Sequence, residues 1–318
     1  MSYDDTPLIP ADTHKSSIVF SHQQRYEPKT MTDGELRLIV LTGSDRPEVL
    51  EVWDNLLPAL EARQNVTVVG KYSRGEELEA GQDADLVVVL GGDGSIIRGC
   101  RQLGNHQLPI VGINLGRLGF LADLSPEEFL DNLACLLNGN YTVHEHLMFE
   151  CQHHTASGIQ TDLGLNEVTV NCAGSLKILD INLRIDGEHV TTFSCDGLIL
   201  STPVGSTAHN LSAGGPILRQ ELQAFCLTAI CPHTLTVRPI VDSADRTYEL
   251  TVVDPPEGVM LVIDGQIRKS VAAEDRIVIT QAESTFKLIR FPGHSYYRTL
   301  HRKLGWRGQL DYRERKGK

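Results

Sequence analysis

Apolar residues follow two different periods along the first 140 residues of the chain. Short apolar runs bounded by polar residues are typical of strands in a parallel sheet. Such runs stand at 36–41, 66–69, 86–90 and 109–113. Between these runs, apolar residues at 47–60 and 96–103 recur at the spacing of a helix. The alternation predicts a doubly wound α/β domain with helices on both faces of its sheet.

A Ser-Pro-Glu-Glu sequence at 125–128 predicts the start of a further helix. The serine can cap the helix, the proline fits the first helical position, and the second glutamate completes a capping box. This helix is expected to run to Asn138 and to end at Gly139. In the earlier helix, Pro58 can introduce a kink or an early end.

After Asn140 the pattern changes to short alternating stretches, which predict an antiparallel β-rich domain. These stretches lie at 147–151, 167–171, 178–185, 198–201, 248–253, 260–263 and 276–280. Asp-Gly or Asp-Pro pairs that begin at Asp186, Asp254 and Asp264 indicate hairpin turns between them. Helical spacing returns at 296–304, and this last helix is expected to pack against the first domain.

The patterns divide the chain into four segments. We expect a mobile tail at 1–34, an α/β domain at 35–140, a β-rich domain at 141–294, and a closing helical segment at 295–318.

Composition and charge narrow the range of partners. The net charge of −12 argues against nucleic acids and anionic membranes, because both attract a positive surface. There is no apolar run of the length of a membrane helix, and the N-terminus carries Asp4 and Asp5, so a cytoplasmic protein is expected. The seven cysteines form no Cys-x-x-Cys pair, and therefore neither a zinc site nor a disulfide framework is expected.

The sequence Gly91-Gly92-Asp93-Gly94 directly follows the apolar run 86–90. Open α/β sheets bind ligands where such strands end, and glycines there let backbone N–H groups approach phosphate oxygens. Asp93 alone would repel a phosphate. Its carboxylate is therefore interpreted as a proton acceptor for an attacking hydroxyl or as a magnesium ligand, with a turn capped by aspartate as the alternative.

Two common nucleotide-binding motifs are missing from the sequence. No Gly-x-x-x-x-Gly-Lys-Ser/Thr segment occurs, which excludes a Walker-type loop. The residues after the first predicted strand, 42–45, lack the three-glycine fingerprint of classical dinucleotide-binding domains. Hydride transfer to or from a dinucleotide is therefore disfavoured.

Two further polar segments are suited to binding a nucleotide. Asn166 and Glu167 together offer donors and acceptors for the hydroxyls of a ribose, although such a pair is also common in polar turns. The segment 201–216 is rich in Gly, Ser and Thr, which permits close backbone approach to a ligand. It could equally be a surface connection.

In combination, these segments resemble the NAD kinase family. The Gly-Gly-Asp-Gly sequence at 91–94 is similar to a motif that NAD kinases share with diacylglycerol kinases, sphingosine kinases and 6-phosphofructokinases. The segments that select NAD kinases are 112–121, the Asn166-Glu167 pair, 201–216 and 300–306. The resemblance spans roughly residues 36 to 306, in the same order and spacing.

The resemblance implies transfer of a phosphoryl group from ATP or polyphosphate to the 2′-hydroxyl of the adenosine ribose of NAD, giving NADP. Asp93 would be the catalytic base, and Gly91 and Gly92 would form the phosphate loop. A divalent metal ion, Mg²⁺ carried with ATP, is the implied cofactor. The family also implies a homo-oligomer, a dimer or tetramer, whose neighbouring subunits share the substrate site.

The substrate-binding residues that the resemblance implies lie in both predicted domains, and those of 141–294 make this the NAD-binding domain. They are Gly94, Arg98, Phe120, Asn166, Glu167, Lys177, Ser194, Asp196, Thr207, Ala208, His209, Asn210, Leu211, Ser212 and Gln266. Taken singly, Arg98, Lys177 and Gln266 are also ordinary surface or hairpin residues.

Two positions depart from the family pattern. Ser95 replaces a threonine, which preserves the hydroxyl. His209 replaces a tyrosine, so the aromatic contact offers less apolar area.

The rival functions are a related kinase that acts on a lipid or a sugar phosphate, and a non-catalytic NAD sensor. The retained Asp93 argues against a sensor, because a pure binder gains nothing from a carboxylate beside phosphates.

Overall fold

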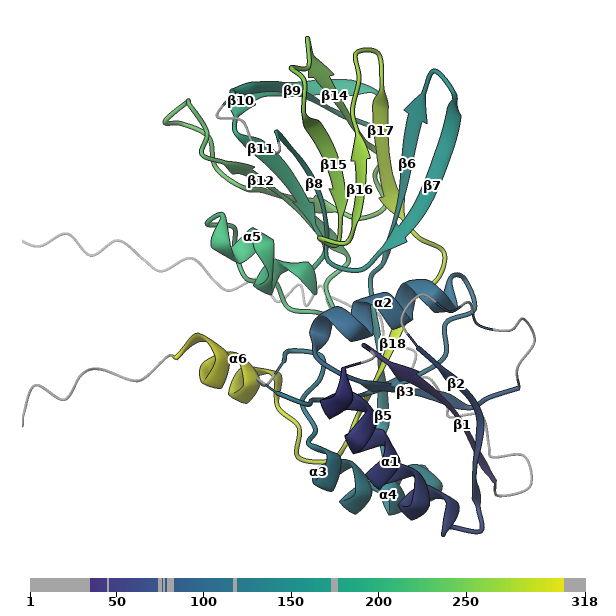
Figure 1. Cartoon of the computed structure of the whole chain (residues 1–318). Coiled ribbons are helices and arrows are strands. Elements are labelled where there is room, and N and C mark those ends of the chain that lie inside the picture. Colours follow the sequence, from purple (N-terminus) through teal and green to yellow (C-terminus); the bar gives the residue numbers. More distant parts are fainter. Residues whose placement is uncertain are drawn as a thin grey trace, which may run out of the picture.

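The structure, a computed structural model, describes residues 35–44, 46–73, 76, 78, 83–116, 119–172 and 177–305. The predicted tail at 1–34 and the end of the closing segment, from residue 306, lie outside the described residues. An α/β domain and a β-sandwich are stacked one above the other in Figure 1. Among the described residues, no helix is both long and apolar enough to cross a bilayer.

The α/β domain is built on a six-stranded sheet. In spatial order its strands are β2 (Val66–Tyr72), β1 (Leu36–Thr42), β3 (Leu86–Leu90), β4 (Ile110–Ile113), β18 (Phe286–Arg290) and β5 (Thr142–His146). Every neighbouring pair is parallel except β18 and β5, which are antiparallel.

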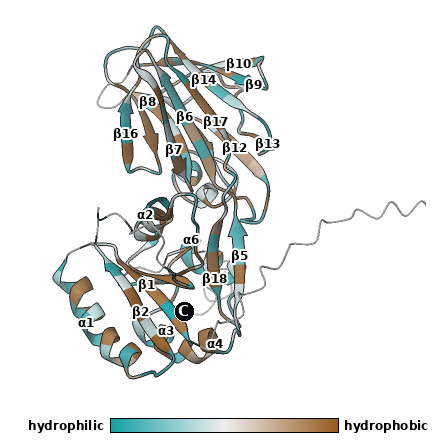
Figure 2. Cartoon of the chain, turned by 90° about the vertical axis from the view of Figure 1, so that its right-hand side faces the viewer, coloured by the Kyte–Doolittle hydropathy of each residue, from teal (hydrophilic) through white to brown (hydrophobic). Residues whose placement is uncertain are grey.

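Helices cover both faces of this sheet, as predicted. Leu38 and Val40 of β1 pack on one face with Trp53 of α1 (Pro47–Glu61), whereas Ile39 packs on the other face with Ile96 of α2 (Asp93–Leu103). Neighbouring residues of a strand point to opposite faces, and a strand buried on both faces must be apolar throughout. Figure 2 shows this concentration of apolar residues along the strands.

The predicted helix after Ser125 forms, but in two pieces, α3 (Pro126–Asp131) and α4 (Leu133–Leu137). The capping box is present, because Ser125 Oγ accepts from the Glu128 N–H and the Glu128 carboxylate accepts from the Ser125 N–H. The break lies at Asn132, whose ψ of 0° departs from helical geometry. Pro58 lies inside α1 and does not end it.

The second domain is a sandwich of two six-stranded antiparallel sheets, which confirms the predicted β-rich class. One sheet has the order β10 (Glu188–Cys195), β9 (Leu179–Ile185), β14 (Tyr248–Val253), β17 (Arg276–Gln281), β6 (Phe149–Thr155) and β7 (Gly158–Gly164). The other has the order β13 (Ile240–Ser243), β12 (Ala224–Ile230), β11 (Gly197–Ser201), β8 (Glu167–Cys172), β15 (Val259–Ile263) and β16 (Ile267–Ser270).

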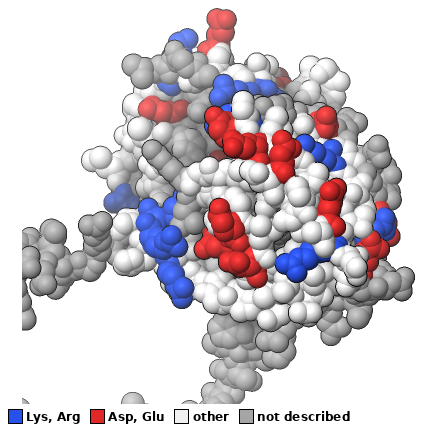
Figure 3. All heavy atoms as spheres, turned by 60° about the horizontal axis from the view of Figure 1, so that its bottom comes forward, with Lys and Arg blue, Asp and Glu red and all other residues white. Residues whose placement is uncertain are grey.

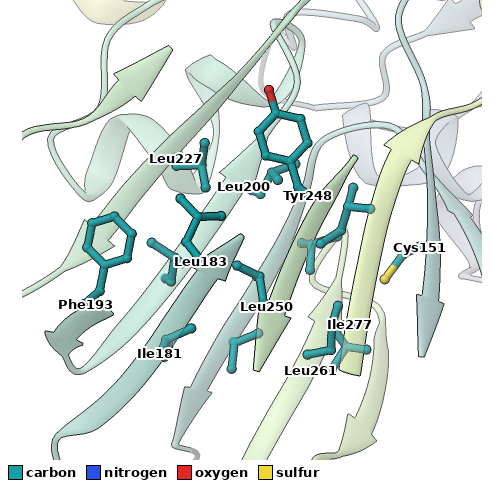
Figure 4. Packing of buried hydrophobic residues seen from close by; sticks show 14 of the residues in the cluster. Cys151, Ile181, Leu183, Phe193, Leu200, Leu227, Tyr248, Leu250, Leu261 and Ile277 are labelled. Atoms are coloured by element: carbon teal, nitrogen blue, oxygen red, sulfur yellow. The ribbon is translucent and has the colours of Figure 1, made fainter. Parts of the chain in front are cut away.

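The inner faces of these two sheets form one core. Figure 4 shows Leu183 and Leu250 from one sheet beside Leu200 and Leu227 from the other, with Tyr248 among them. Apolar burial on this scale is the main force that holds the sheets together.

Two of the three predicted hairpin turns are confirmed. Asp186 and Asp264 both have a φ of 50°, and each is followed by a glycine in a turn between antiparallel neighbours. The turn at Asp254 is not a hairpin, because it joins β14 to β15, which belong to different sheets. An Asp-Pro pair reports a reversal of the chain but not which strand the reversed segment joins.

The sheets also correct the predicted limits of the second domain, 141–294. Both β5 and β18 belong to the α/β sheet, so the sandwich extends only from β6 to β17. The sequences of β5 and β18 are short and partly polar, like those of the sandwich strands. No local signal therefore shows that these two strands join the α/β sheet and not a sheet of the sandwich. The chain therefore crosses between the domains twice.

The closing helix α6 (Tyr296–Leu304) contacts the first domain, as expected, and also the sandwich domain. The ammonium of Lys303 lies 5.4 Å from the ring centroid of Phe120, and the Tyr296 hydroxyl donates to the carbonyl of Leu218 at 3.2 Å. Figure 3 shows the underside of the molecule, where acidic and basic side chains are interspersed among uncharged ones.

Candidate active site

The Gly-Gly-Asp-Gly sequence forms the turn between β3 and α2. Gly91 has a φ of 145°, a conformation that residues with a side chain rarely adopt, and Gly92 is the residue that precedes the helix. Asp93 is the first residue of α2. Gly92 and Gly94 are exposed, so their backbone groups can be reached by a ligand.

The Asp93 carboxylate accepts three backbone hydrogen bonds from the segment between β4 and α3. The N–H of Phe120 donates to Oδ2 at 2.8 Å, and those of Leu121 and Ala122 donate to Oδ1 at 3.0 Å each. The carboxylate is thus bound to this segment rather than to its own helix, which disfavours a simple cap. A carboxylate offers about four acceptor positions, so capacity remains on Oδ2.

Gly119 makes this contact possible. A Cβ at residue 119 would lie 1.9 Å from Asp93 Oδ1, well inside the contact distance of the two atoms. Gly119 is therefore required for this position of Asp93, which the sequence does not indicate.

A second carboxylate, Asp264, holds the Asn166-Glu167 pair in the same way. It accepts from the N–H groups of Leu165, Asn166 and Glu167 at 2.9, 2.7 and 3.1 Å. Asp264 is buried, and burial raises its pKa despite these bonds. The sequence indicates Asp264 only as a turn residue.

Glu167 is a buried acid without its full set of partners. Burial and the neighbouring charge of Asp264 raise the pKa of Glu167 to about 8, although the N–H of His209 opposes the shift. Within the described residues, its Oε2 has no hydrogen-bond partner. The raised pKa of Glu167 favours the protonated carboxyl group, which can donate a hydrogen bond.

Gln266 connects the two domains at this point. Its Nε2 donates to the carbonyl of Gly94 at 3.0 Å, and its Oε1 accepts from Arg101 Nη2 at 2.6 Å. Gln266 follows the Asp264 turn directly, so the turn that holds Asn166 and Glu167 is also bonded to α2. Arg98 lies on the same helix and donates to the carbonyl of Gly43 at 3.0 Å.

The segment 201–216 folds into a short 3-10 turn, Gly205–Thr207, and the helical turn α5 (His209–Ser212). A Cβ at Gly205 would lie 2.1 Å from the carbonyl oxygen of Asn166, so this segment packs tightly on the Asn166-Glu167 pair. The predicted ligand residues Thr207, Ala208, His209, Leu211 and Ser212 are partly or fully exposed.

The side chain of Asn210 is bonded to other parts of the protein. It is fully buried, its amide donates to the carbonyls of Ser206 and Pro216, and its oxygen accepts from Thr228. With these bonds its amide holds the loop rather than a ligand.

Three predicted site residues lie at the end of the sandwich that is opposite to the Asn166-Glu167 pair. They are Lys177, Ser194 and Asp196. Ser201 at one end of β11 pairs with Glu167, whereas Gly197 at the other end follows Asp196 directly. The four residue steps between them span about 13 Å. Ser194 donates to Asp180, and Lys177 is exposed. Within one chain, these three residues are not brought to Asp93.

The fold and this arrangement define the class of the protein. A glycine-rich turn at the end of a parallel strand carries a fixed carboxylate, which is the arrangement expected of a phosphotransferase acting on nucleotides. Residues 22–141 match the ATP-NAD kinase N-terminal domain, and residues 165–291 match the ATP-NAD kinase C-terminal domain. The chain belongs to the ATP-NAD kinase family.

Similar proteins extend over most of the chain. An NAD kinase of Rhodopirellula baltica is 45% identical over 87% of this chain and 89% of its own length. An NAD kinase of Geotalea daltonii is 42% identical over 71% of this chain and 80% of its own length.

Two solved structures share the fold. An Archaeoglobus fulgidus NAD kinase in complex with ATP superposes with a TM-score of 0.67 at 30% identity, over 85% of this chain and 99% of that one. The yeast NADH kinase complexed with NADH superposes with a TM-score of 0.80 at 22% identity, over 87% of this chain and 89% of that one.

Proposed function

We propose that the protein transfers the terminal phosphoryl group of ATP to the 2′-hydroxyl of the adenosine ribose of NAD, giving NADP. The observation that carries the proposal is the Asp93 carboxylate, fixed by three N–H groups at the end of β3 with acceptor capacity left on Oδ2. The relatives named NAD kinase, which are similar over most of the chain, support the choice of substrates.

The proposed roles follow from the positions of the groups. Asp93 accepts the proton of the attacking hydroxyl, and the exposed amides of Gly92 and Gly94 face the phosphates. Asn166 and the protonated Glu167 bind ribose hydroxyls. Because transfer in line needs little covalent chemistry from the protein, positioning supplies most of the rate.

Magnesium is proposed to enter the site on the phosphates of ATP. In the described part of the chain, no group of three or more His, Cys, Asp or Glu side chains is arranged to hold a metal ion. When bound, the ion would neutralise the charge that develops on the phosphates. Polyphosphate is the alternative donor, because it presents the same anionic groups.

A second subunit is proposed to complete the substrate site. Lys177, Ser194 and Asp196 lie near the Gly197 end of β11, and β11 spans about 13 Å from there to its Glu167 end. In a homo-oligomer, a dimer or tetramer, the Gly197 end of β11 in one subunit would face the Asp93 end of its neighbour. The reaction is expected in the cytoplasm, where both nucleotides occur.

Phosphorylation of candidate acceptors by the purified chain tests this function. The protein is incubated with magnesium, with ATP or polyphosphate, and with NAD or NADH, and the NADP or NADPH formed is read by enzymatic cycling. Lipid vesicles and fructose 6-phosphate serve as competing acceptors. Folded protein that makes no NADP above the enzyme-free control, with several metals tried, would refute the proposal.

A further inference from the structure

A buried arginine binds the segment 120–122, which holds Asp93, on the side away from the Asp93 carboxylate. Arg290 is the last residue of β18 and is 6% exposed. Its Nη2 donates to the carbonyl oxygen of Phe120 at 2.8 Å, and its Nη1 makes a longer contact of 3.5 Å with that of Leu121. Arg290 is 197 residues from Asp93 in sequence, and no motif marks it.

The same peptide groups therefore bind Arg290 on one side and Asp93 on the other. The carbonyl of Phe120 and the N–H of Leu121 belong to one peptide group, which accepts from Arg290 and donates to Asp93. The carbonyl of Leu121 and the N–H of Ala122 form a second such group. Hydrogen bonds that run through a shared peptide polarise and strengthen one another.

The ion pair behind Arg290 keeps the guanidinium in place. Asp123 Oδ2 lies 2.8 Å from Arg290 Nη1 and 3.0 Å from His294 Nε2. Burial raises the pKa of Asp123, but the adjacent His294 imidazole and the charge of Arg290 outweigh it and hold the pKa below its usual value. Burial lowers the pKa of Arg290, and the charges of Asp123 and Asp93 oppose this, so the guanidinium stays charged.

We propose that Arg290 is a positioning residue for phosphoryl transfer, which fixes and polarises the two peptide groups that hold the Asp93 carboxylate. Arg290 touches neither nucleotide in this proposal. It sets where the carboxylate points, and its planar fork is suited to reaching two successive carbonyls and a carboxylate at once. The inference rests on the proposed function.

The surroundings of Arg290 allow a direct chemical test. Arg290 lines two cavities, of about 230 and 250 Å³, that lie beside α6. Truncation of its side chain would leave a guanidinium-sized space that opens onto them. A small cation from solution can therefore enter and replace the missing group.

The experiment compares Arg290→Ala with wild type in steady-state kinetics. We expect kcat to fall roughly 10- to 100-fold, because a small displacement of a reacting group has effects of this size. KM for NAD should stay nearly unchanged. Guanidinium chloride at low millimolar concentration should restore part of kcat, whereas urea and potassium chloride at matched concentration should not.

Two further variants separate positioning from stability. Lys269 forms a partly buried ion pair with Asp162 in the sandwich, so Lys269→Ala should lower stability without lowering kcat or responding to guanidinium. Arg290→Lys keeps the charge but not the fork, and it should retain more kcat than the alanine variant. It also replaces that variant if Arg290→Ala does not fold.

The outcomes are distinct from those for the proposed function. An inactive wild-type protein would overturn the function and the inference together. An active wild type with kcat unchanged in the folded Arg290 variants would overturn only the inference. A loss of kcat that neither lysine nor guanidinium recovers would also overturn it, because the loss would then reflect disrupted packing.

Discussion

The change Asp93→Asn tests the proposed chemistry and the geometry of the site together. Asparagine is nearly isosteric with aspartate, but it cannot take the proton and it has only one acceptor oxygen. In the structure, that oxygen can keep the bonds from Leu121 and Ala122. Its amide would then face the N–H of Phe120, which now donates to Asp93 at 2.8 Å.

The magnitude of both effects follows from these contacts. Loss of positioned proton transfer should lower kcat by about 10²–10⁴-fold. The N–H of Phe120 is partly buried, and leaving it without its acceptor costs up to about 1–3 kcal/mol of the free energy of unfolding. At roughly 2–4 °C for each kcal/mol, the melting temperature should fall by several degrees. A residue that only capped α2 would show neither loss, because asparagine caps as well as aspartate.

Asp264→Asn is the matched control, because Asp264 accepts three backbone N–H groups in the same arrangement. It should lower the melting temperature comparably and raise KM for NAD through Asn166 and Glu167, with a much smaller loss of kcat. Kinetics are measured by NADP formation, and stability is measured by thermal unfolding with and without NAD.

Two results would refute the reasoning about Asp93. If Asp93→Asn turned over at nearly the wild-type rate while binding NAD, Asp93 would not be the base. If high magnesium concentrations recovered most of the lost rate, Asp93 would act as a metal ligand instead.

Three further changes test neighbouring parts of the site. Because the pKa of Glu167 is raised to about 8 in the folded state, its contribution to the free energy of unfolding is fully present below its ordinary pKa of 4.5 and is lost as pH rises through 8. Glu167→Gln should therefore flatten this part of the pH profile of the melting temperature. An unchanged profile would contradict the raised pKa of Glu167. His209→Tyr should tighten NAD binding by about 0.5–1.5 kcal/mol, measured by calorimetry, and an unchanged or weaker affinity would place the ring outside the nucleotide contact. Gly119→Ala should lower kcat by about 10²-fold, since the Cβ of the new alanine would displace the Asp93 carboxylate. Gly116→Ala is the control, because a Cβ at residue 116 meets no atom within 4 Å. Equal activity of the two variants would show that the close approach of Gly119 to Asp93 is dispensable.

Much of the fold followed from local patterns in the sequence. The period of apolar residues identified β3, α1 and α6, because the side of an element that is buried is set by its own repeat. Edge strands were less visible. β7 is mostly exposed and carries no alternating apolar pattern, so its sequence resembles a polar loop.

The position of Asp93 at a strand-to-helix turn was also determined locally. A glycine-rich turn after an apolar strand places its residues at the edge of the sheet, whichever strands lie beside it. The place of Asp93 in the fold could therefore be predicted before its neighbours were known. Asn166 and Glu167, at the start of β8, were selected by the family resemblance, because an Asn-Glu pair by itself is also common in polar turns.

The groups that hold these residues in place come together only through the packing of the whole chain. Gly119, Asp264 and Arg290 lie 26 to 197 positions in sequence from Asp93 or from the Asn166-Glu167 pair. Asp264 and Arg290 lie in sequences typical of a turn and a strand, and the segment 112–121, although part of the family resemblance, does not show that its Gly119 meets Asp93. In the structure, Lys177, Ser194 and Asp196 likewise lie away from Asp93 within one chain. The Asn210 amide points into its own segment, 201–216, where it bonds to Ser206 and Pro216. A repeat in the sequence specifies which face of an element is buried, but the partner on that face is chosen by packing of the whole chain.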